Sequence, residues 1–191
     1  MNVYDFDGTI YNGDSTRDFC FYLVLHYKKV LKYLMPFLID VVRHYGCHII
    51  TKTKMKETLY KFLKCFNDGE IENIVNDFWK INEKKIYSWY YDLKKDDDVI
   101  ISASPDFLLK PICKKLNVNL ICSKVNIANG DYIGINCYGG EKVRRFYEIY
   151  KDGVIDKFYS DSKSDEPLAK LAKSAYIVAK NGSIKIWKMK S

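Results

Sequence analysis

Two different patterns of apolar and polar positions divide this chain. From Ser15 to about Tyr91, apolar side chains recur at spacings of three and four residues, which is the period of a helix with one buried face. Pro36 kinks or ends a helix near the first apolar run, and the segment 67–69 (Asn-Asp-Gly) interrupts the period. We therefore predict a helical unit over residues 15–91. The periodic positions of two of its helices are Met55, Leu59, Phe62, Leu63 and Phe66, then Ile71, Ile74, Val75, Phe78 and Trp79.

From Asp98 onward, short apolar runs alternate with helical segments. This alternation predicts a parallel sheet covered by helices. Residues 129–131 (Asn-Gly-Asp) favour a tight turn, so residues 132–135 are expected to form part of a hairpin. The expected strands are Val99–Ile101, Asn119–Cys122, Ile155–Tyr159, Ala175–Ala179 and a short last one at Ser183–Trp187, and the expected helices are Phe107–Leu116, Lys142–Tyr150 and Asp165–Lys173.

A first short strand, Asn2–Tyr4, stands alone before the helical unit. The predicted fold class is α/β: a Rossmann-like parallel sheet covered by helices, with an inserted all-helical cap. We assign residues 1–14 and 92–191 to the core domain and residues 15–91 to the cap. An insertion at this point would lie over the carboxyl ends of the strands, where such sheets hold their ligands, and would act as a lid that closes the site from water.

The segment Phe19–Val42 is apolar enough to require a check for a membrane span. No uncharged stretch in it reaches the roughly 18–20 residues that cross a bilayer, so we expect no transmembrane segment. A helical hairpin packed in a small bundle is the favoured interpretation. A helix lying on a membrane surface is the alternative, which leaves peripheral membrane contact open. The residues that interrupt the run are His26, Lys28, Lys29, Lys32 and Asp40.

The composition limits the class of protein. With 191 residues, the chain has room for one core domain and an insertion. Its aromatic content of 15% argues against disorder, and its net charge of +7 attracts anions in general without an RGG-type or basic-aromatic segment that would indicate nucleic-acid binding. The six cysteines form no C-x-x-C pair, which favours free thiols in a reducing cytoplasm. No signal peptide is expected, because the first strand begins almost at Met1.

Two carboxylates follow the first strand directly. Asp5 and Asp7 are two residues apart, so their side chains point the same way in extended backbone, while Gly8 and Thr9 turn the chain out of the sheet. Two like charges so close are costly unless a cation or a shared proton relieves the repulsion. The pair therefore indicates a metal-assisted site with one carboxylate as nucleophile and the other as acid/base. The aspartates at 96–98 are interpreted instead as a solvated junction.

Three further segments carry matching chemistry. Ser102 ends a predicted strand and is followed by Ala103, Lys142 begins a predicted helix, and Asp161 and Asp165 follow the next strand. A carboxylate pair, a hydroxyl, an amine and a second carboxylate pair, in this order, resemble the four motifs of the haloacid dehalogenase (HAD) superfamily. The resemblance covers nearly the whole chain. The helical insertion resembles the C1 cap of the subfamily that includes phosphoserine phosphatase.

The resemblance implies a role for each motif residue. Asp5 would be the nucleophile that forms an aspartyl-phosphate, and Asp7 would protonate the leaving oxygen and later deprotonate the attacking water. The carboxylates of Asp5 and Asp161 and the backbone carbonyl of Asp7 would bind Mg²⁺. Asp165 would hold a metal-bound water or orient Lys142, which would neutralise charge on Asp5 and on the transferred phosphoryl group.

Substrate contacts follow from the same resemblance. Thr9, Ser102 and Ala103 are assigned to substrate binding, with Ser102 donating a hydrogen bond to a phosphoryl oxygen. Asp14 lies where phosphoserine phosphatase has a glutamate that contacts the substrate ammonium group. Ser160 departs from the family pattern, which often has glycine there; the change should alter the local turn without removing the metal ligand that follows it.

The predicted function is a Mg²⁺-dependent phosphatase acting on a small phosphorylated metabolite. Phosphoserine is one open alternative, although the cap segment 51–64 lacks the P-F-x-x-x-L-x-x-R run of phosphoserine phosphatase. A lipid phosphate such as phosphatidylglycerophosphate is another, because the cap is apolar. A phosphotransferase and a non-catalytic phosphate- or lipid-binding module are alternatives of a different class. The cap cations that would meet a second anionic group are Arg17, Arg43, Lys52 and Lys54.

Overall fold

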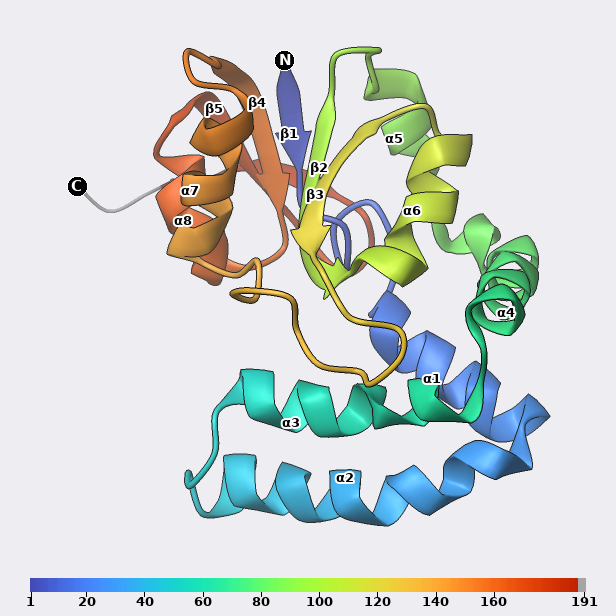
Figure 1. The fold of residues 1–191 in the computed structure, drawn as a ribbon. Helices are drawn as coiled ribbons and strands as arrows, with labels where there is room; N and C mark the ends of the chain where they lie inside the picture. The colour runs from blue at the N-terminus through green and yellow to red at the C-terminus, as the bar shows by residue number, and fades with distance from the viewer. Residues whose placement is uncertain (189–191) are drawn as a thin grey trace.

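The computed structural model describes residues 1–188, and its centre is a six-stranded sheet in the order β3-β2-β1-β4-β5-β6. The strands are parallel except for β6, which runs antiparallel to β5. This is the Rossmann-like sheet that the sequence predicts, with β1 at its middle (Figure 1). The strands are β1 (Asn2–Tyr4), β2 (Val99–Pro105), β3 (Asn119–Ser123), β4 (Ile155–Ser160), β5 (Ala172–Val178) and β6 (Ile184–Ile186).

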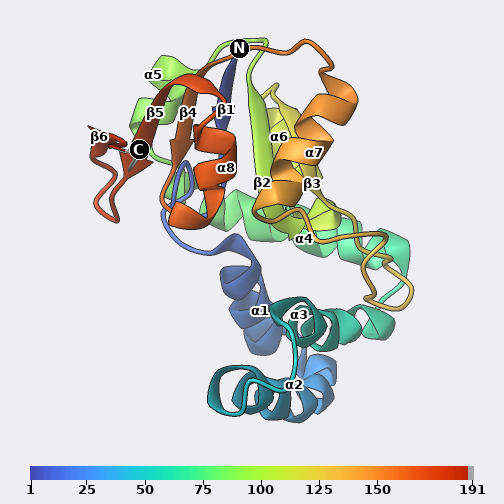
Figure 2. The same cartoon turned by 90° about the vertical axis from the view of Figure 1, so that its left-hand side faces the viewer.

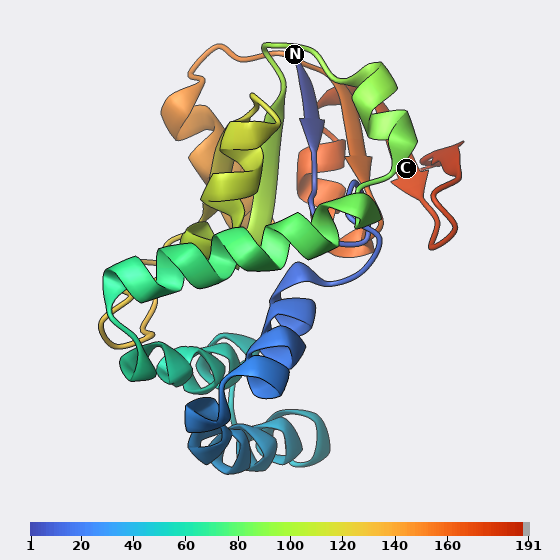
Figure 3. The ribbon, with the colours of Figure 1, turned by 90° about the vertical axis from the view of Figure 1, so that its right-hand side faces the viewer.

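Helices cover both faces of the sheet. They are α4 (Asp68–Asn82), α5 (Ser88–Leu93), α6 (Asp106–Lys115), α7 (Gly140–Ile149) and α8 (Glu166–Ala169). Because side chains alternate between the two faces of a strand, Tyr4 packs in one core cluster with residues of α4–α6, while its neighbour Val3 packs in a second cluster with residues of α7 and α8. Figure 2 shows α7 and α8 in front of the sheet, and Figure 3 shows the opposite face with α4–α6.

The helical insertion follows β1 and its turn. Its elements before α4 are α1 (Ser15–His26), η1 (Lys28–Tyr33), α2 (Leu34–Val41), η2 (Val42–Gly46), α3 (Lys52–Tyr60) and η3 (Lys61–Cys65). In Figures 1 and 2, α2 and α3 lie side by side at the end of the molecule farthest from the N-terminus, and the carboxyl ends of the parallel strands point toward them. The insertion thus lies over the carboxyl ends of the strands, where the sequence analysis predicts the ligand site.

Local sequence explains where these helices begin. Pro36 lies in the first turn of α2, where a missing backbone N–H breaks no helical hydrogen bond. Asn67 ends the preceding segment because its side chain accepts from the backbone N–H of Glu70 at 2.9 Å, and the Glu70 carboxylate accepts from the backbone N–H of Asn67 at 2.9 Å. This capping box satisfies two orphan donors of α4. The segment 67–69, which interrupts the helical period in the sequence, is therefore the start of α4.

The helices α4 and α5, which the sequence assigns to the cap, pack directly on the sheet and its helices. The indole of Trp79 donates to the carbonyl of Leu108 on α6 at 2.7 Å. The ring of Tyr90 packs edge-to-face on Tyr4 of β1, with centroids 5.2 Å apart. The domain limits at residues 14/15 and 91/92 stay a prediction.

Three predicted elements differ from the structure. β2 runs on to Pro105 instead of ending at Ile101. The helix expected over 165–173 ends at Ala169, because the chain from Ala172 onward pairs with β4. Residues 132–135 form no hairpin strand in the described chain; Tyr132 makes only an isolated bridge to Val125.

Asp98 corrects the interpretation of residues 96–98 as a solvated junction. Its side chain is fully buried. One carboxylate oxygen accepts the backbone N–H of Asn2 at 2.9 Å, and the other accepts the backbone N–H of Lys95 at 2.8 Å. A buried carboxylate needs such donors, so Asp98 holds the start of β1 beside β2.

Over residues 1–188, none of the helices combines the length and apolar character that crossing a bilayer requires.

Candidate active site

The turn after β1 presents Asp5 and Asp7 at the carboxyl edge of the sheet. The backbone N–H of Asp5 still donates to Tyr159 of β4, at 2.9 Å, so Asp5 is fixed by the sheet. Gly8 has φ +71°, a conformation that side-chain-bearing residues rarely adopt, and its N–H donates to the carbonyls of Tyr11 and Gly13. The chain therefore leaves the sheet at Gly8 and reaches α1 within a few residues.

Lys142 joins the first and last motifs. Its ammonium group lies 2.8 Å from Asp5 Oδ1 and 2.8 Å from Asp165 Oδ2, and all three side chains are buried or nearly so. Burial disfavours charge on Lys142, but the attraction of Asp5 and Asp165 outweighs it and raises the pKa of the lysine. Lys142 is thus a fixed cation between two carboxylates that are 160 residues apart in the chain.

The carboxylates of this site outnumber its buried cation. Burial is the largest cause that raises the pKa of Asp5 to about 7; Lys142 opposes the rise and Asp165 adds to it. Burial, followed by the charge of Asp14, raises the pKa of Asp7 to about 6. Both groups therefore hold protons more readily than ordinary aspartates, as expected where like charges crowd together.

Asp7 is oriented by two donors. Its Oδ1 accepts the backbone N–H of Ser15, the first residue of α1, at 2.6 Å, and its Oδ2 accepts the hydroxyl of Ser104 at 2.5 Å. The Ser104 hydroxyl also lies 3.1 Å from that of Thr16. Sequence reasoning stopped at Ser102 and Ala103 and missed Ser104, although the three residues are adjacent.

Asp161 lies against the backbone of Gly8. A Cβ atom added to Gly8 would come within 2.2 Å of Asp161 Oδ2, so only glycine leaves room for this carboxylate. The backbone N–H of Asp161 donates to the hydroxyl of Thr9 at 2.9 Å. Thr9 is fully buried, and the structure places it as a support for Asp161 and not among the residues that line the pocket. Burial and the charge of Asp165 raise the pKa of Asp161.

Ser160 has a clear partner. Its hydroxyl donates to Asp165 Oδ2 at 2.8 Å, the same oxygen that accepts from Lys142. The serine that departs from the family pattern thus helps to hold Asp165. The other oxygen, Asp165 Oδ1, is buried without a hydrogen-bond partner among the described residues. A buried acceptor of this kind calls for a water or ion that the protein does not itself supply.

Asp5, Asp7, Lys142 and Asp165 line a small pocket of about 150 Å³, and Asp161 lines the neighbouring hollow. Most of the pocket's lining residues are polar or charged, and they come mainly from the turn after β1, the end of β2, the start of α7 and the loop after β4. Ser102 and Ala103 line it as expected, and so does Asp14, whose side chain caps α1 by accepting from Arg17 N–H at 2.8 Å. The full lining is Asp5, Asp7, Asp14, Lys56, Ser102, Ala103, Ser104, Asn136, Tyr138, Lys142, Ser162, Ser164 and Asp165.

Among the described side chains of the cap, Lys56 is the cation that lines this pocket. Sequence reasoning named other cap cations. Lys54 pairs with Glu57 at 3.1 Å, and Arg43 pairs with Asp40 at 3.2 Å. Arg17 lines a neighbouring hollow of about 460 Å³ together with Asp161. The side chain of Lys52 lies outside the described part. The helical period separates Lys56 from Lys54, two residues before it, but does not indicate which face of the helix lies above the pocket.

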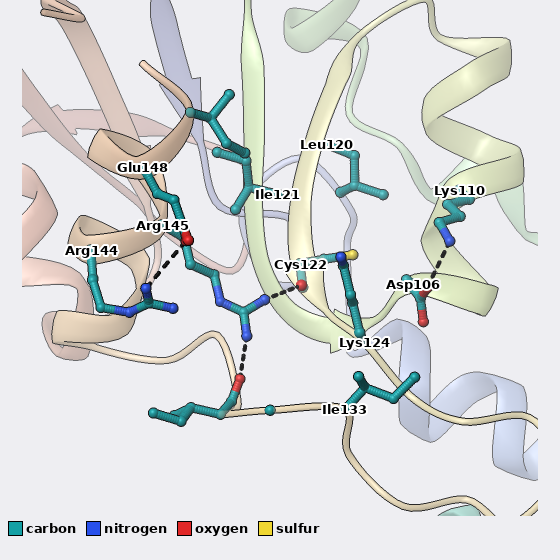
Figure 4. A pocket seen from close by; sticks show the side chains of 13 residues that line it. Asp106, Lys110, Leu120, Ile121, Cys122, Lys124, Ile133, Arg144, Arg145 and Glu148 are labelled. Carbon is teal, nitrogen blue, oxygen red and sulfur yellow. Dashed lines mark hydrogen bonds and ion pairs between the residues drawn. The ribbon is translucent and has the colours of Figure 1, made fainter. Parts of the chain in front are cut away.

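A separate hollow of about 420 Å³ lies beside the edge strand β3 and contains none of the motif residues (Figure 4). Its charged side chains are largely satisfied within the protein. Lys110 pairs with Asp106 at 2.7 Å, Arg144 pairs with Glu148 at 3.2 Å, and Arg145 donates to the carbonyl of Cys122 at 2.6 Å. The candidate active site is therefore the smaller pocket of about 150 Å³, which the motif residues line.

The sequence matches a family of known proteins. Residues 3–170 match the family model described as haloacid dehalogenase-like hydrolase. No curated protein matches the sequence.

Solved structures share the fold at low sequence identity. A protein of unknown function from Bordetella pertussis Tohama I has a TM-score of 0.78 and 17% identity over 92% of this chain and 87% of its own. A substrate-bound phosphoserine phosphatase has a TM-score of 0.53 and 12% identity, with 91% of this chain and 82% of its own covered. A phosphoserine phosphohydrolase-like protein from Francisella tularensis subsp. tularensis SCHU S4 has a TM-score of 0.51 and 18% identity, with 92% and 86% covered.

Proposed function

Because the chain belongs to the haloacid dehalogenase-like hydrolases, and is a hydrolase with the fold of the phosphoserine phosphatases, we propose that it hydrolyses a small phosphomonoester through an aspartyl-phosphate on Asp5. The observation that carries the proposal is the position of Lys142, 2.8 Å from both Asp5 and Asp165 in a buried pocket. A fixed ammonium beside a carboxylate at a strand end suits attack on an anionic phosphoryl group, since positioning and charge stabilisation are the main requirements of phosphoryl transfer.

The first step uses Asp5 and Asp7. A carboxylate oxygen of Asp5 attacks phosphorus, the ester P–O bond breaks, and the leaving oxygen takes a proton from Asp7. A pKa of about 6 makes Asp7 able to hold that proton near neutral pH. In the second step Asp7 takes a proton from water, the resulting hydroxide attacks phosphorus, and the bond to Asp5 breaks with release of phosphate.

Lys142 and the pocket hydroxyls stabilise the charge that develops. Lys142 stays protonated, because its two carboxylate partners raise its pKa. Ser102 is buried within β2, where its oxygen accepts the backbone N–H of Ser104 at 3.1 Å. This bond leaves the Ser102 proton free to point at a phosphoryl oxygen.

A divalent cation would balance the carboxylate charge that Lys142 leaves uncompensated. Among the described residues, Asp165 Oδ1 is a buried acceptor with no hydrogen-bond partner, and Asp161 forms no ion pair. The described residues contain no group of three or more His, Cys, Asp or Glu side chains that would hold a metal, so the site we propose uses two carboxylates, Asp5 and Asp161, with the backbone carbonyl of Asp7. When bound, Mg²⁺ would neutralise phosphoryl charge.

We place the substrate among small phosphorylated metabolites, because the pocket measures about 150 Å³ and is lined mainly by polar side chains. Lys56 supports a substrate with a second anionic group, and Asp14 supports one with an ammonium group. Phosphoserine carries both kinds of group. We also place the reaction in the cytoplasm, which agrees with six cysteines that are all free thiols.

Hydrolysis of a generic aryl phosphate in the presence of Mg²⁺ tests the proposal. The variant Asp5→Asn should abolish turnover, because an amide is not a competent nucleophile here. In the wild-type protein, mass spectrometry after an acid quench should detect a peptide phosphorylated on Asp5, and this peptide should be absent from the variant. Asp152→Asn, in the exposed turn after α7, is the matched control and should keep wild-type activity. Retained turnover in a folded Asp5→Asn variant would contradict the assignment.

Adding alcohols to the same reaction separates hydrolysis from phosphotransfer. Inorganic phosphate as the sole phosphorylated product supports a phosphatase, whereas formation of a new phosphate ester would show a phosphotransferase. A panel of amino-acid, sugar and glycerolipid phosphates then identifies the substrate class.

A further inference from the structure

The outermost helix of the insertion carries an apolar stripe on its solvent side. Met35, Leu38, Ile39 and Val42 are 64%, 51%, 48% and 62% exposed, and Tyr45 in the next turn is 61% exposed. The first four recur at positions i, i+3, i+4 and i+7, so they share one face of the continuous helix formed by α2 and η2. We call these five side chains the α2 stripe.

The opposite face of the same helix is already packed. Asp40 is buried there, and its Oδ2 accepts the hydroxyl of Thr58 on α3 at 2.6 Å. Leu34 and Phe37 are half-buried on this side. Figures 1 and 2 show α3 between α2 and the sheet. The α2 stripe lies on the face of the helix opposite Asp40 and is exposed to solvent. A helix that is apolar on both sides is normally covered on both sides.

Basic residues are frequent in the sequence on both sides of the stripe, and the one acid of the same segment is buried. Between residues 19 and 54 the sequence holds six lysines and arginines and one acidic residue, Asp40. This segment supplies most of the net charge of +7. Lys28 and Lys32 of η1 are exposed, and neither forms a salt bridge with any side chain that the structure describes.

This combination selects one kind of partner. We propose that the α2 stripe docks on an anionic membrane surface, with its apolar side chains at the boundary of the acyl chains and Lys28 and Lys32 beside lipid phosphates. An apolar stripe flanked by lysines is the pattern of interfacial helices. A symmetric contact between two copies would bring the same basic residues face to face, so the charges favour the membrane over a dimer.

The docked face and the catalytic pocket lie on opposite sides of α3. Thr58 of α3 bonds to α2, while Lys56 of α3 lines the pocket. Docking therefore leaves the pocket free for a soluble phosphomonoester. Vesicle binding is expected to be independent of catalysis, so Asp5→Asn should bind vesicles as the wild-type protein does, and the failure of one proposal does not affect the other.

Flotation with vesicles of phosphatidylcholine and phosphatidylglycerol tests the docking. The wild-type protein should float with these vesicles, less with pure phosphatidylcholine, and less at high salt, because screening weakens attraction to anionic lipids. The double variant Leu38→Ser/Val42→Ser should lower the vesicle partition coefficient about tenfold or more, since two apolar side chains lose their burial. Both side chains are exposed in the free protein, so the fold and the phosphatase activity should be kept.

The matched control is Ile133→Ser/Ile135→Ser, which replaces two similarly exposed apolar side chains, 56% and 65%, in the loop between β3 and α7 and outside the α2 stripe. It should float like the wild-type protein. No flotation of the wild-type protein, or an equal loss in both double variants, would overturn the proposal. A dimer in solution that Leu38→Ser/Val42→Ser converts to a monomer, without vesicle binding by the wild-type protein, would show instead that a second copy covers the stripe.

Discussion

At the scale of single residues, the site depends on side chains that hold other side chains. Ser104 donates to Asp7, Ser160 donates to Asp165, and Thr9 accepts from the backbone of Asp161. Each of these hydroxyls is buried and has its partner within the site. The four-motif pattern in the sequence identifies the groups proposed for the chemistry, while these hydroxyls fix where those groups point.

Removing the Ser104 hydroxyl tests this supporting role. We expect Ser104→Ala to lower kcat about tenfold with little change in KM, because Asp7 loses the bond that aims it while the phosphate contacts remain. Steady-state kinetics with an aryl phosphate measures the two parameters separately. Ser183→Ala, in the turn before β6, is the control and should leave both unchanged. A rise in KM alone would show that Ser104 contacts the substrate instead.

The residues that sequence reasoning missed share a physical reason. Asp5, Asp7, Lys142 and Asp161 belong to motifs whose order in the chain predicts a shared site, and the structure brings them together. Lys56 reaches the pocket only through the way α3 lies over the sheet. The helical period fixes which residues share a face of α3, but it does not fix which turn of that face lies above the pocket.

At the scale of elements, capping and pairing decide the boundaries. The segment 67–69 looks like a helix break in the sequence, and the structure shows that Asn67 caps α4. The predicted helix over 165–173 is shortened because strand pairing with β4 claims the chain from Ala172. Local propensity does not contain that tertiary contact. The Rossmann-like sheet itself was predictable, because buried parallel strands give continuous apolar runs.

The capping box of α4 makes a prediction for stability. Asn67→Ala should lower the free energy of unfolding by about 1 kcal/mol, since both backbone donors of the box lose their partner geometry. Urea unfolding followed by circular dichroism measures the change. Asn76→Ala, at an exposed position in the middle of α4, is the matched control, and alanine should be neutral or slightly stabilising there. Equal effects of the two substitutions would contradict a capping role.

At the scale of the whole molecule, the site brings together carboxylates from distant parts of the chain, and these carboxylates repel one another. Burial and neighbouring acids raise the pKa of Asp5 to about 7 and also raise that of Asp161. The folded protein therefore gains stability from any divalent cation that binds between them, because a ligand of the native state opposes unfolding.

Thermal unfolding with and without Mg²⁺ checks this consequence. Mg²⁺ in excess should raise the Tm of the wild-type protein by several degrees, about 2 kcal/mol of added stability when the metal is far above its Kd. Asp161→Asn should lose most of that rise, whereas Asp156→Asn, on the exposed side of β4, should keep it. An equal rise in wild type and Asp161→Asn would place the metal elsewhere.

The bond between Asp7 and the backbone N–H of Ser15 links the sheet to the first residue of the insertion. If α1 moved away from the sheet, that donor would leave with it. Its loss would raise the pKa of Asp7 further, because a hydrogen bond to a carboxylate favours the charged form. One backbone bond thus couples the position of the insertion to the proton affinity of the proposed acid.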